Sequence, residues 1–127
     1  MRASVFIGTS LDGFIARANG DLDWLPHGGG EDLGYEAFMA TVDALVIGRN
    51  TFEKVLTFDT WPYGEKAVFV LSTRVRTAAP LEAKVEWMSG TPADIFGVTG
   101  RDIALQHIAT RHLAGGLVQS EYEVAVQ

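Results

Sequence analysis

The sequence predicts an α/β fold with a central, mostly parallel mixed sheet. Two apolar runs, Ala44 to Ile47 and Ala67 to Leu71, show no polar alternation, which is typical of strands covered on both faces. Each run stops at a residue suited to a turn, Gly48 after the first and Ser72 after the second. Buried strands followed directly by polar residues are expected in open α/β sheets, where ligands lie across the carboxyl edge.

Composition favours a single domain over residues 1–127. Of the 127 residues, 47% are hydrophobic and 20% are charged, which is enough for one globular domain with its own core. The net charge of −6 and the absence of a Lys or Arg run argue against a nucleic-acid surface. The chain has no cysteine, which excludes disulfides, thiolate metal sites and a cysteine nucleophile.

The histidines and the apolar runs suggest neither a metal centre nor a membrane protein. His27, His107 and His112 lack the spacing of metal ligands, and we interpret His107 and His112 as solvated or packing residues. No apolar run approaches the ~20 residues that a membrane-spanning helix needs. The N-terminus also lacks a charged leader followed by an apolar stretch and a cleavage site. We therefore expect a cytoplasmic protein.

The remaining elements follow from local patterns along the chain. A turn rich in side-chain oxygens is expected at Ser10 to Gly13, followed by a polar loop through Asn19 to Asp21 that is a candidate lid. The expected strands are Ala3–Gly8, Ala44–Ile47, Ala67–Leu71, Val85–Met88, Ile95–Thr99 and Leu117–Val126, and the expected helices are Glu31–Val42, Thr51–Leu56 and Asp102–His112.

The helix expected over Glu31 to Val42 carries an acidic residue near its apolar stripe. Tyr35, Phe38, Met39 and Val42 follow the i, i+3, i+4, i+7 spacing of a buried helix face. Asp32 lies in the first turn of this helix. By residue type alone, an acidic side chain there is most often a cap or a partner of the helix dipole.

Polar residues after Gly48 and after Leu71 form two candidate phosphate contacts. Arg49, Asn50 and Thr51 supply a cation, an amide and a hydroxyl where a helix is expected to begin. The alternative is an ordinary strand-to-helix turn with Thr51 as its cap. The stretch from Ser72 to Arg74 repeats the pattern of hydroxyls and a cation after a buried strand, and its alternative is a simple polar loop.

Several segments together resemble the dihydrofolate reductase superfamily, most closely the bacterial reductases related to the C-terminal domain of bifunctional riboflavin-biosynthesis deaminase-reductases. Their order and spacing agree with that family from Met1 to about Ser89, and the resemblance implies a three-layer fold. The matching segments are Ser10-Leu11-Asp12-Gly13-Phe14-Ile15-Ala16, Asp21-Leu22-Asp23-Trp24-Leu25, Glu31-Asp32-Leu33-Gly34-Tyr35, Ile47-Gly48-Arg49-Asn50-Thr51-Phe52-Glu53 and Val70-Leu71-Ser72-Thr73-Arg74.

The resemblance implies an NADPH site and a substrate site. In the family an acidic residue of the first helix anchors the substrate ring, and Asp32 occupies that position as the implied catalytic residue, with Trp24, Tyr35 and Phe38 beside it at the substrate. The implied cofactor-binding residues are Ile7, Gly8, Ser10, Asp12, Gly13, Gly48, Arg49, Asn50, Thr51, Leu71, Ser72, Thr73, Arg74, Thr99, Gly100, Arg101 and Asp102.

The sequence departs from the family after about Ser89. Only Thr91 to Asp94 stands where the family has a full helix, and Gly100-Arg101 replaces its Gly-Gly turn, so the Arg101 side chain either blocks the cofactor pyrophosphate or pairs with it. The family's last strand and glycine-rich loop have no counterpart, so the fold is expected to be shortened at its C-terminus.

Two functions follow from the resemblance and its departures. One is an NADPH-dependent reductase of a small heterocyclic substrate, of pterin or aminopyrimidine type. The other is a non-catalytic nucleotide-binding or assembly protein on the same fold. In either case we expect a homodimer, formed through the sheet edge or through Leu117 to Val126, because an apolar terminal strand leaves backbone groups that a partner would cover.

Overall fold

The computed structural model describes residues 3–25, 33–74, 78–90, 103–113 and 117–125. Its contacts define two compact units, one of Met1–Ala40 with Ile103–Gln127 and the other of Thr41–Asp102. The described residues contain a parallel three-stranded sheet and an antiparallel two-stranded sheet. The α/β class and the parallel sheet are therefore confirmed. The two kinds of pairing occupy separate sheets in the described chain, whereas the sequence predicted one mixed sheet.

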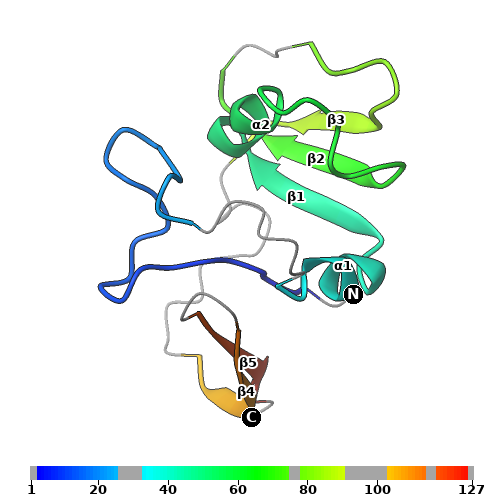
Figure 1. The fold of residues 1–127 in the computed structure, drawn as a ribbon. Helices are drawn as coiled ribbons and strands as arrows, with labels where there is room; N and C mark the ends of the chain where they lie inside the picture. Colours follow the sequence, from blue (N-terminus) through cyan, green and yellow to red (C-terminus); the bar gives the residue numbers. More distant parts are fainter. Residues whose placement is uncertain (1–2, 26–32, 75–77, 91–102, 114–116, 126–127) are drawn as a thin grey trace. The chain divides into compact units, whose positions relative to one another are not determined.

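The parallel sheet lies in the unit Thr41–Asp102 and has the strand order β1-β2-β3 (Figure 1). Its strands are β1, Ala44–Gly48, β2, Ala67–Leu71, and β3, Val85–Met88. All three strands were predicted. The expectation that both faces are covered is wrong for β1, where Ala44, Val46 and Gly48 are exposed because β1 lies at an edge of the sheet. In the parallel register Gly48 is opposite Leu71, and Leu71 is opposite Met88. The three strands therefore end in one row.

Helix α2, Arg49–Val55, follows β1 directly and is anchored to the sheet by Phe52. The Phe52 side chain is fully buried against Val68 and Val70 of β2, and its ring meets the edges of the Trp61 and Trp87 rings. This cluster is the hydrophobic core of the unit. A buried aromatic side chain of this kind contributes strongly to stability because it removes a large apolar area from water.

Helix α2 begins earlier than the sequence predicted. Gly48 is its N-cap residue in an extended conformation, and no side chain makes a capping hydrogen bond. The helical backbone thus starts at Arg49, and Thr51 lies inside the helix. The alternative of Thr51 as an ordinary cap is wrong.

Helix α1, Tyr35–Ala40, is shorter than the predicted Glu31–Val42. Gly34 precedes it with a φ of 84°, a left-handed conformation that interrupts an α-helix. Val42 lies beyond the end of the helix and cannot join the predicted stripe, of which Met39 alone is buried. Residues 31 and 32 lie outside the described residues.

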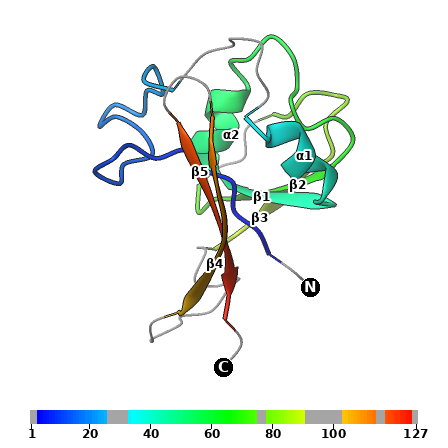
Figure 2. The same ribbon diagram turned by 60° about the horizontal axis from the view of Figure 1, so that its bottom comes forward.

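The antiparallel sheet is a hairpin of β4, Leu105–His112, and β5, Val118–Val124, which Figure 2 shows as a long twisted pair. The final strand is confirmed, but the helix predicted over Asp102–His112 is wrong. An irregularity between His107 and Ala109 inserts a residue into β4 and breaks the alternation of the side chains. The alternation of side chains that would identify β4 as a strand is therefore not visible in the sequence.

The strand predicted at Ala3–Gly8 is not formed within the described chain, where these residues have no strand assignment. A strand requires a hydrogen-bonded neighbour, which an apolar run cannot specify by itself. The predicted strand Ile95–Thr99 lies outside the described residues. Across the ranges that the structure describes, no helix has the length and apolar character needed to cross a membrane.

Candidate functional site

Polar residues gather where the parallel strands end. Because Gly48, Leu71 and Met88 stand in one row, the residues that follow them lie at the same carboxyl edge of the sheet (Figure 1). We call the set Gly48, Arg49, Ser72, Thr73 and Arg74 the sheet edge. The structure thus brings together residues that are distant in sequence and that were predicted to bind phosphate.

Space is open above Gly48. Its φ of −78° is accessible to any residue, and a Cβ built on it would meet no atom within 4 Å. Neither the backbone nor the packing of the described residues therefore requires a glycine at this position. An empty space above a glycine at a strand end is what a closely approaching phosphate group would need.

The Ser72 side chain organises the second turn of the sheet edge. Its hydroxyl accepts a hydrogen bond from the Arg74 amide at 3.0 Å, and the Ser72 amide donates to the Met88 carbonyl at 3.0 Å. Ser72 is half-buried, whereas Thr73 and Arg74 are exposed. The turn therefore holds the backbone while the Thr73 hydroxyl and the Arg74 guanidinium remain accessible. The predicted polar loop is an ordered serine turn.

Arg49 is engaged on its own helix. One of its terminal nitrogens, Nη1, lies 2.9 Å from Glu53 Oε1, one turn further along α2. Asn50 and Thr51 are exposed beside it. The edge thus carries two cations, and within the described chain no ion pair engages the Arg74 side chain.

A second group of predicted residues surrounds a turn in the other unit. The Ser10 hydroxyl donates to Asp12 Oδ1 at 2.5 Å and accepts from the Phe14 amide at 3.0 Å. The Gly13 amide donates to the Ser10 carbonyl at 2.9 Å. These bonds confirm the predicted turn at Ser10–Gly13 and hold the Asp12 carboxylate against it.

This turn forms one wall of an open hollow with a volume of about 400 Å³. The volume falls within the roughly 300 to 1,000 Å³ that is usual for small-molecule sites. It joins Ser10 and Asp12, predicted to contact the cofactor, with Trp24, predicted to contact the substrate. The residues that line this N-terminal hollow are Ser10, Asp12, Phe14, Ala16, Arg17, Ala18 and Trp24.

The predicted lid loop is tied at its base by Arg17. The Arg17 Nε donates to Asp23, which holds the pKa of Arg17 above its ordinary value through a hydrogen bond and charge attraction. The Arg17 amide also donates to the Asp21 carbonyl at 3.0 Å. At the tip of the loop the Asn19 side-chain amide donates to Asp21 Oδ2 at 2.7 Å. These bonds hold the loop in one arrangement, and Ala16, Arg17 and Ala18 just before it line the hollow.

Phe6 and Gly8 lie close to the predicted substrate residues. The Phe6 ring lies 5.9 Å from the Tyr35 ring and 5.1 Å from the Phe38 ring, centroid to centroid. A Cβ at Gly8 would lie 2.9 Å from Leu25 and 3.9 Å from Trp24, so the chain passes close to Trp24 there. The neighbouring Ile7 side chain is exposed.

Partial burial of Tyr35 raises the pKa of its hydroxyl group. Desolvation raises the pKa of Tyr35 above its ordinary value of 10.0, because burial disfavours the charged phenolate. The raised pKa favours the folded state below about pH 10, and this contribution is lost as the pH rises further. At neutral pH the Tyr35 hydroxyl is therefore a neutral hydrogen-bonding group.

The structure leaves part of the predicted site unplaced. Asp32, the implied catalytic residue, and Thr99, Gly100, Arg101 and Asp102 lie outside the described residues. Conversely, sequence reasoning missed Phe6, Phe14, Arg17 and Glu53. Phe14 and Arg17 flank the predicted Ser10–Gly13 turn, so their closeness to that turn was the available signal. The i, i+4 spacing of Glu53 from Arg49 was a signal as well.

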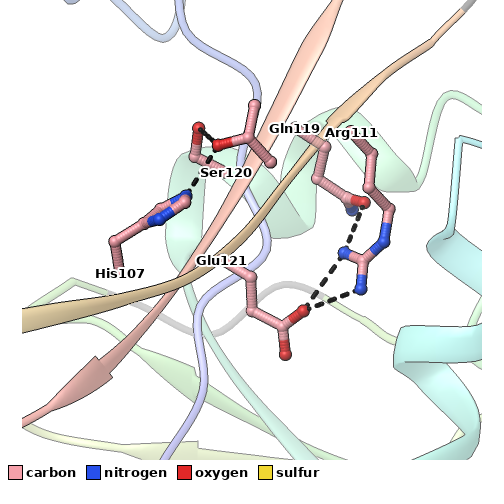
Figure 3. A network of polar contacts seen from close by, with 6 residues as sticks. His107, Arg111, Gln119, Ser120 and Glu121 are labelled. Carbon is pink, nitrogen blue, oxygen red and sulfur yellow. Dashed lines mark hydrogen bonds and ion pairs between the residues drawn. The ribbon is translucent and has the colours of Figure 1, made fainter.

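The hairpin β4–β5 carries polar contacts on both of its faces (Figure 3). Arg111 donates through both terminal nitrogens to Glu121 at 3.1 Å, and Nη1 also lies 3.4 Å from Gln119 Oε1. His107 Nε2 lies 2.6 Å from the Thr110 hydroxyl, and its ring packs against Tyr122. Both His107 and His112 are exposed, in agreement with the solvated or packing role assigned to them. Within the described chain, no three acidic or histidine side chains are grouped as metal ligands would be.

Known proteins that are similar to this chain include one relative by sequence and one solved structure. No protein-family model matches the sequence. The uncharacterized protein YwjB of Bacillus subtilis (strain 168) is 45% identical over 71 residues, which are 54% of this chain, and the match covers 40% of the length of YwjB. The crystal structure of a "putative riboflavin biosynthesis protein" from Shewanella sp. PV-4 superposes with a TM-score of 0.76 at 29% identity, covering 94% of this chain and 97% of that chain. The chain therefore has the α/β fold of a protein named for riboflavin biosynthesis.

Proposed function

We propose that this chain is an NADPH-dependent reductase of the dihydrofolate reductase superfamily that transfers hydride to a small heterocycle of pterin or aminopyrimidine type. The observation that carries the proposal is the common row of Gly48, Leu71 and Met88, which brings Arg49 and Arg74 to one carboxyl edge. In open α/β sheets this edge is the usual position of a nucleotide.

The residues at the sheet edge fit a phosphorylated dinucleotide. The open space above Gly48 accepts a phosphate group, and a guanidinium binds phosphate oxygens through parallel hydrogen bonds. The exposed Thr73 hydroxyl and Arg74 side chain fit a 2′-phosphate, which needs cationic or hydrogen-bonding partners. These features favour NADPH over NADH as the cofactor.

The N-terminal hollow, taken by itself, fits a flat heterocyclic ring. NADPH supplies the hydride when it is bound. Trp24 and Phe14 provide apolar walls that can position a flat ring, and Ser10 and Asp12 provide hydrogen-bonding groups. Asp32 is proposed to hold a proton or a charged hydrogen bond to a ring nitrogen of the substrate.

The structural comparison supports a heterocycle as the substrate. The Shewanella protein is named for riboflavin biosynthesis, and riboflavin is a heterocyclic compound. A reductase that acts on a pterin or an aminopyrimidine would belong to the same area of chemistry. The reaction and the cofactor remain our proposal for this chain.

The test is a pair of titrations with NADPH and NADH on the parent protein and on Arg74→Ala. Charge-assisted hydrogen bonds contribute about 1.5 to 3 kcal/mol, so Arg74→Ala should weaken NADPH roughly tenfold or more and weaken NADH less. Lys84→Ala is the matched control, because Lys84 directly precedes β3 at the opposite edge of the sheet and is also exposed. Equal affinity of the parent for NADPH and NADH would contradict the assignment.

The non-catalytic alternative makes a different prediction for the same protein. A nucleotide-binding or assembly protein would bind NADPH and gain thermal stability from it, since any ligand of the folded state does so. It would not oxidise NADPH with any substrate in a screen of pterins, aminopyrimidines and simple carbonyls. The Gly100-Arg101 departure, which lies outside the described residues, is the feature that keeps this alternative in view.

A further inference from the structure

The Arg49–Glu53 ion pair places a negative charge at the proposed nucleotide edge. The two side chains approach to 2.9 Å, with the Arg49 side chain 26% exposed and the Glu53 side chain 41% exposed. Glu53 lies one turn after Arg49 on α2, and Arg49 is itself part of the sheet edge. A ligand that contacts Arg49 therefore also comes close to the Glu53 carboxylate.

The order of the two charges is not the order that stabilises a helix most. Pairs spaced i, i+4 favour the acidic residue nearer the start and the basic residue nearer the end, in line with the helix dipole. In α2 the arginine comes first and the glutamate one turn later, and no acidic residue occupies the first turn. Helix stability alone thus gives this pair little benefit.

We infer that Glu53 is an internal counter-ion that occupies Arg49 and lowers the affinity of the sheet edge for phosphate-bearing nucleotides. This inference rests on the proposed function of that edge. A guanidinium has five N–H donors, and the Glu53 contact is made through Nη1, so donors remain for a phosphate. A phosphate bound there carries its own negative charge close to the Glu53 carboxylate, and the repulsion between them reduces affinity.

The inference predicts that removing the charge tightens binding. Glu53→Gln keeps an oxygen that can accept from Arg49 but removes the negative charge, whereas Glu53→Ala removes both. Partly exposed charges interact modestly, so NADPH should bind Glu53→Gln about three- to fivefold more tightly than the parent. The difference should shrink at high salt because screening weakens charge repulsion.

Glu65→Gln is the matched control. Glu65 also faces a cation, Lys84, at 3.8 Å in the same unit, but Lys84 directly precedes β3 at the amino edge of the sheet. Glu65→Gln removes as much negative charge from the chain as Glu53→Gln does. It should leave NADPH affinity within about twofold of the parent, because screening weakens charge interactions over distance.

The outcomes separate this inference from the proposed function. If the parent binds NADPH and Glu53→Gln binds it equally or less tightly, the inference alone is overturned. Equal tightening by Glu53→Gln and Glu65→Gln also overturns it, because the effect would then be one of net charge. No detectable NADPH binding by the parent or by either Glu53 variant, each folded by its melting curve, overturns the proposed function and the inference together.

Discussion

Gly34 and Gly48 differ in backbone conformation and in the space around them. Gly34 has a φ of 84°, and a Cβ there would lie 3.2 Å from Nε2 of Gln119. Gly48 has an ordinary φ and open space around the position of a Cβ. The fold itself requires the first glycine, whereas the second leaves room for a ligand.

The two alanine variants should therefore behave in opposite ways. Gly34→Ala places a side chain in a left-handed conformation and should lower the free energy of unfolding by roughly 1 to 2 kcal/mol. Gly48→Ala should keep stability or raise it by up to about 1 kcal/mol, because alanine reduces the freedom of the unfolded chain. Under the proposed function Gly48→Ala should nevertheless weaken NADPH. Denaturant unfolding and an NADPH titration of both variants check this, and a destabilised Gly48→Ala that binds NADPH normally would contradict it.

Asp32 provides the sharpest residue-level test of catalysis. If it has no role in catalysis, Asp32→Asn should keep most function, because the two side chains have nearly the same size and shape. If it serves the substrate, the variant should keep its melting curve and NADPH affinity but lose turnover by orders of magnitude, since an amide cannot transfer the proton. Unchanged turnover with a substrate found by screening would remove Asp32 from the catalytic assignment.

At the scale of elements, α2 and the parallel sheet depend on one aromatic contact. Phe52 is fully buried between β2 and the rings of Trp61 and Trp87. It also lies next to Glu53 and in the helix that carries Arg49. The packing of Phe52 therefore positions the Arg49 side of the sheet edge as well as stabilising the core.

Phe52→Ala should lower the free energy of unfolding by about 3 to 5 kcal/mol, the usual cost of truncating a buried phenylalanine. Phe58→Ala is the matched control, because Phe58 lies in the same unit and is 50% exposed. Its loss should cost roughly 0.5 kcal/mol or less, as is usual for surface substitutions. Chemical denaturation of both variants distinguishes the two sites, and similar losses of stability would contradict the observed packing.

At the scale of the whole molecule, one domain and a homodimer remain predictions. The hairpin β4–β5 exposes apolar side chains at Val118, Tyr122 and Val124, between 55% and 58% of each, within the segment where dimerisation was expected. Both strands of a two-stranded hairpin have backbone groups on their outer sides that a second copy can pair. A second copy that packs on the hairpin would also remove these apolar side chains from water.

A single domain that dimerises should unfold in one transition whose midpoint rises with protein concentration. Tyr122→Glu should abolish that concentration dependence by placing a charge in the interface. Leu81→Glu, at an exposed position of the other unit, should leave it unchanged. Thermal unfolding at several concentrations, with sedimentation at micromolar protein, measures both effects. Concentration-independent melting of the parent, together with a monomer in sedimentation, would refute the dimer.

The sequence by itself determined the elements whose signals are local. The apolar runs at 44–47 and 67–71 and the β-prone residues at 85–88 became the three parallel strands, and β2 in the centre of the sheet is the most buried of them. The oxygens of Ser10 and Asp12 predicted a turn because short polar side chains bond to the backbone near them. The candidate residues of the sheet edge were named in the same way, from polar residues that follow buried strands.

Tertiary structure decided the features that depend on distant partners. Whether Ala3–Gly8 pairs as a strand and whether Leu105–His112 forms a strand depend on neighbours that no local pattern specifies. The shared row of Gly48, Leu71 and Met88 follows from strand register, and register depends on the packing of whole strands. The joining of Asp12 with Trp24 around one hollow likewise required the folded chain, because proximity in space is set by packing and not by spacing in sequence.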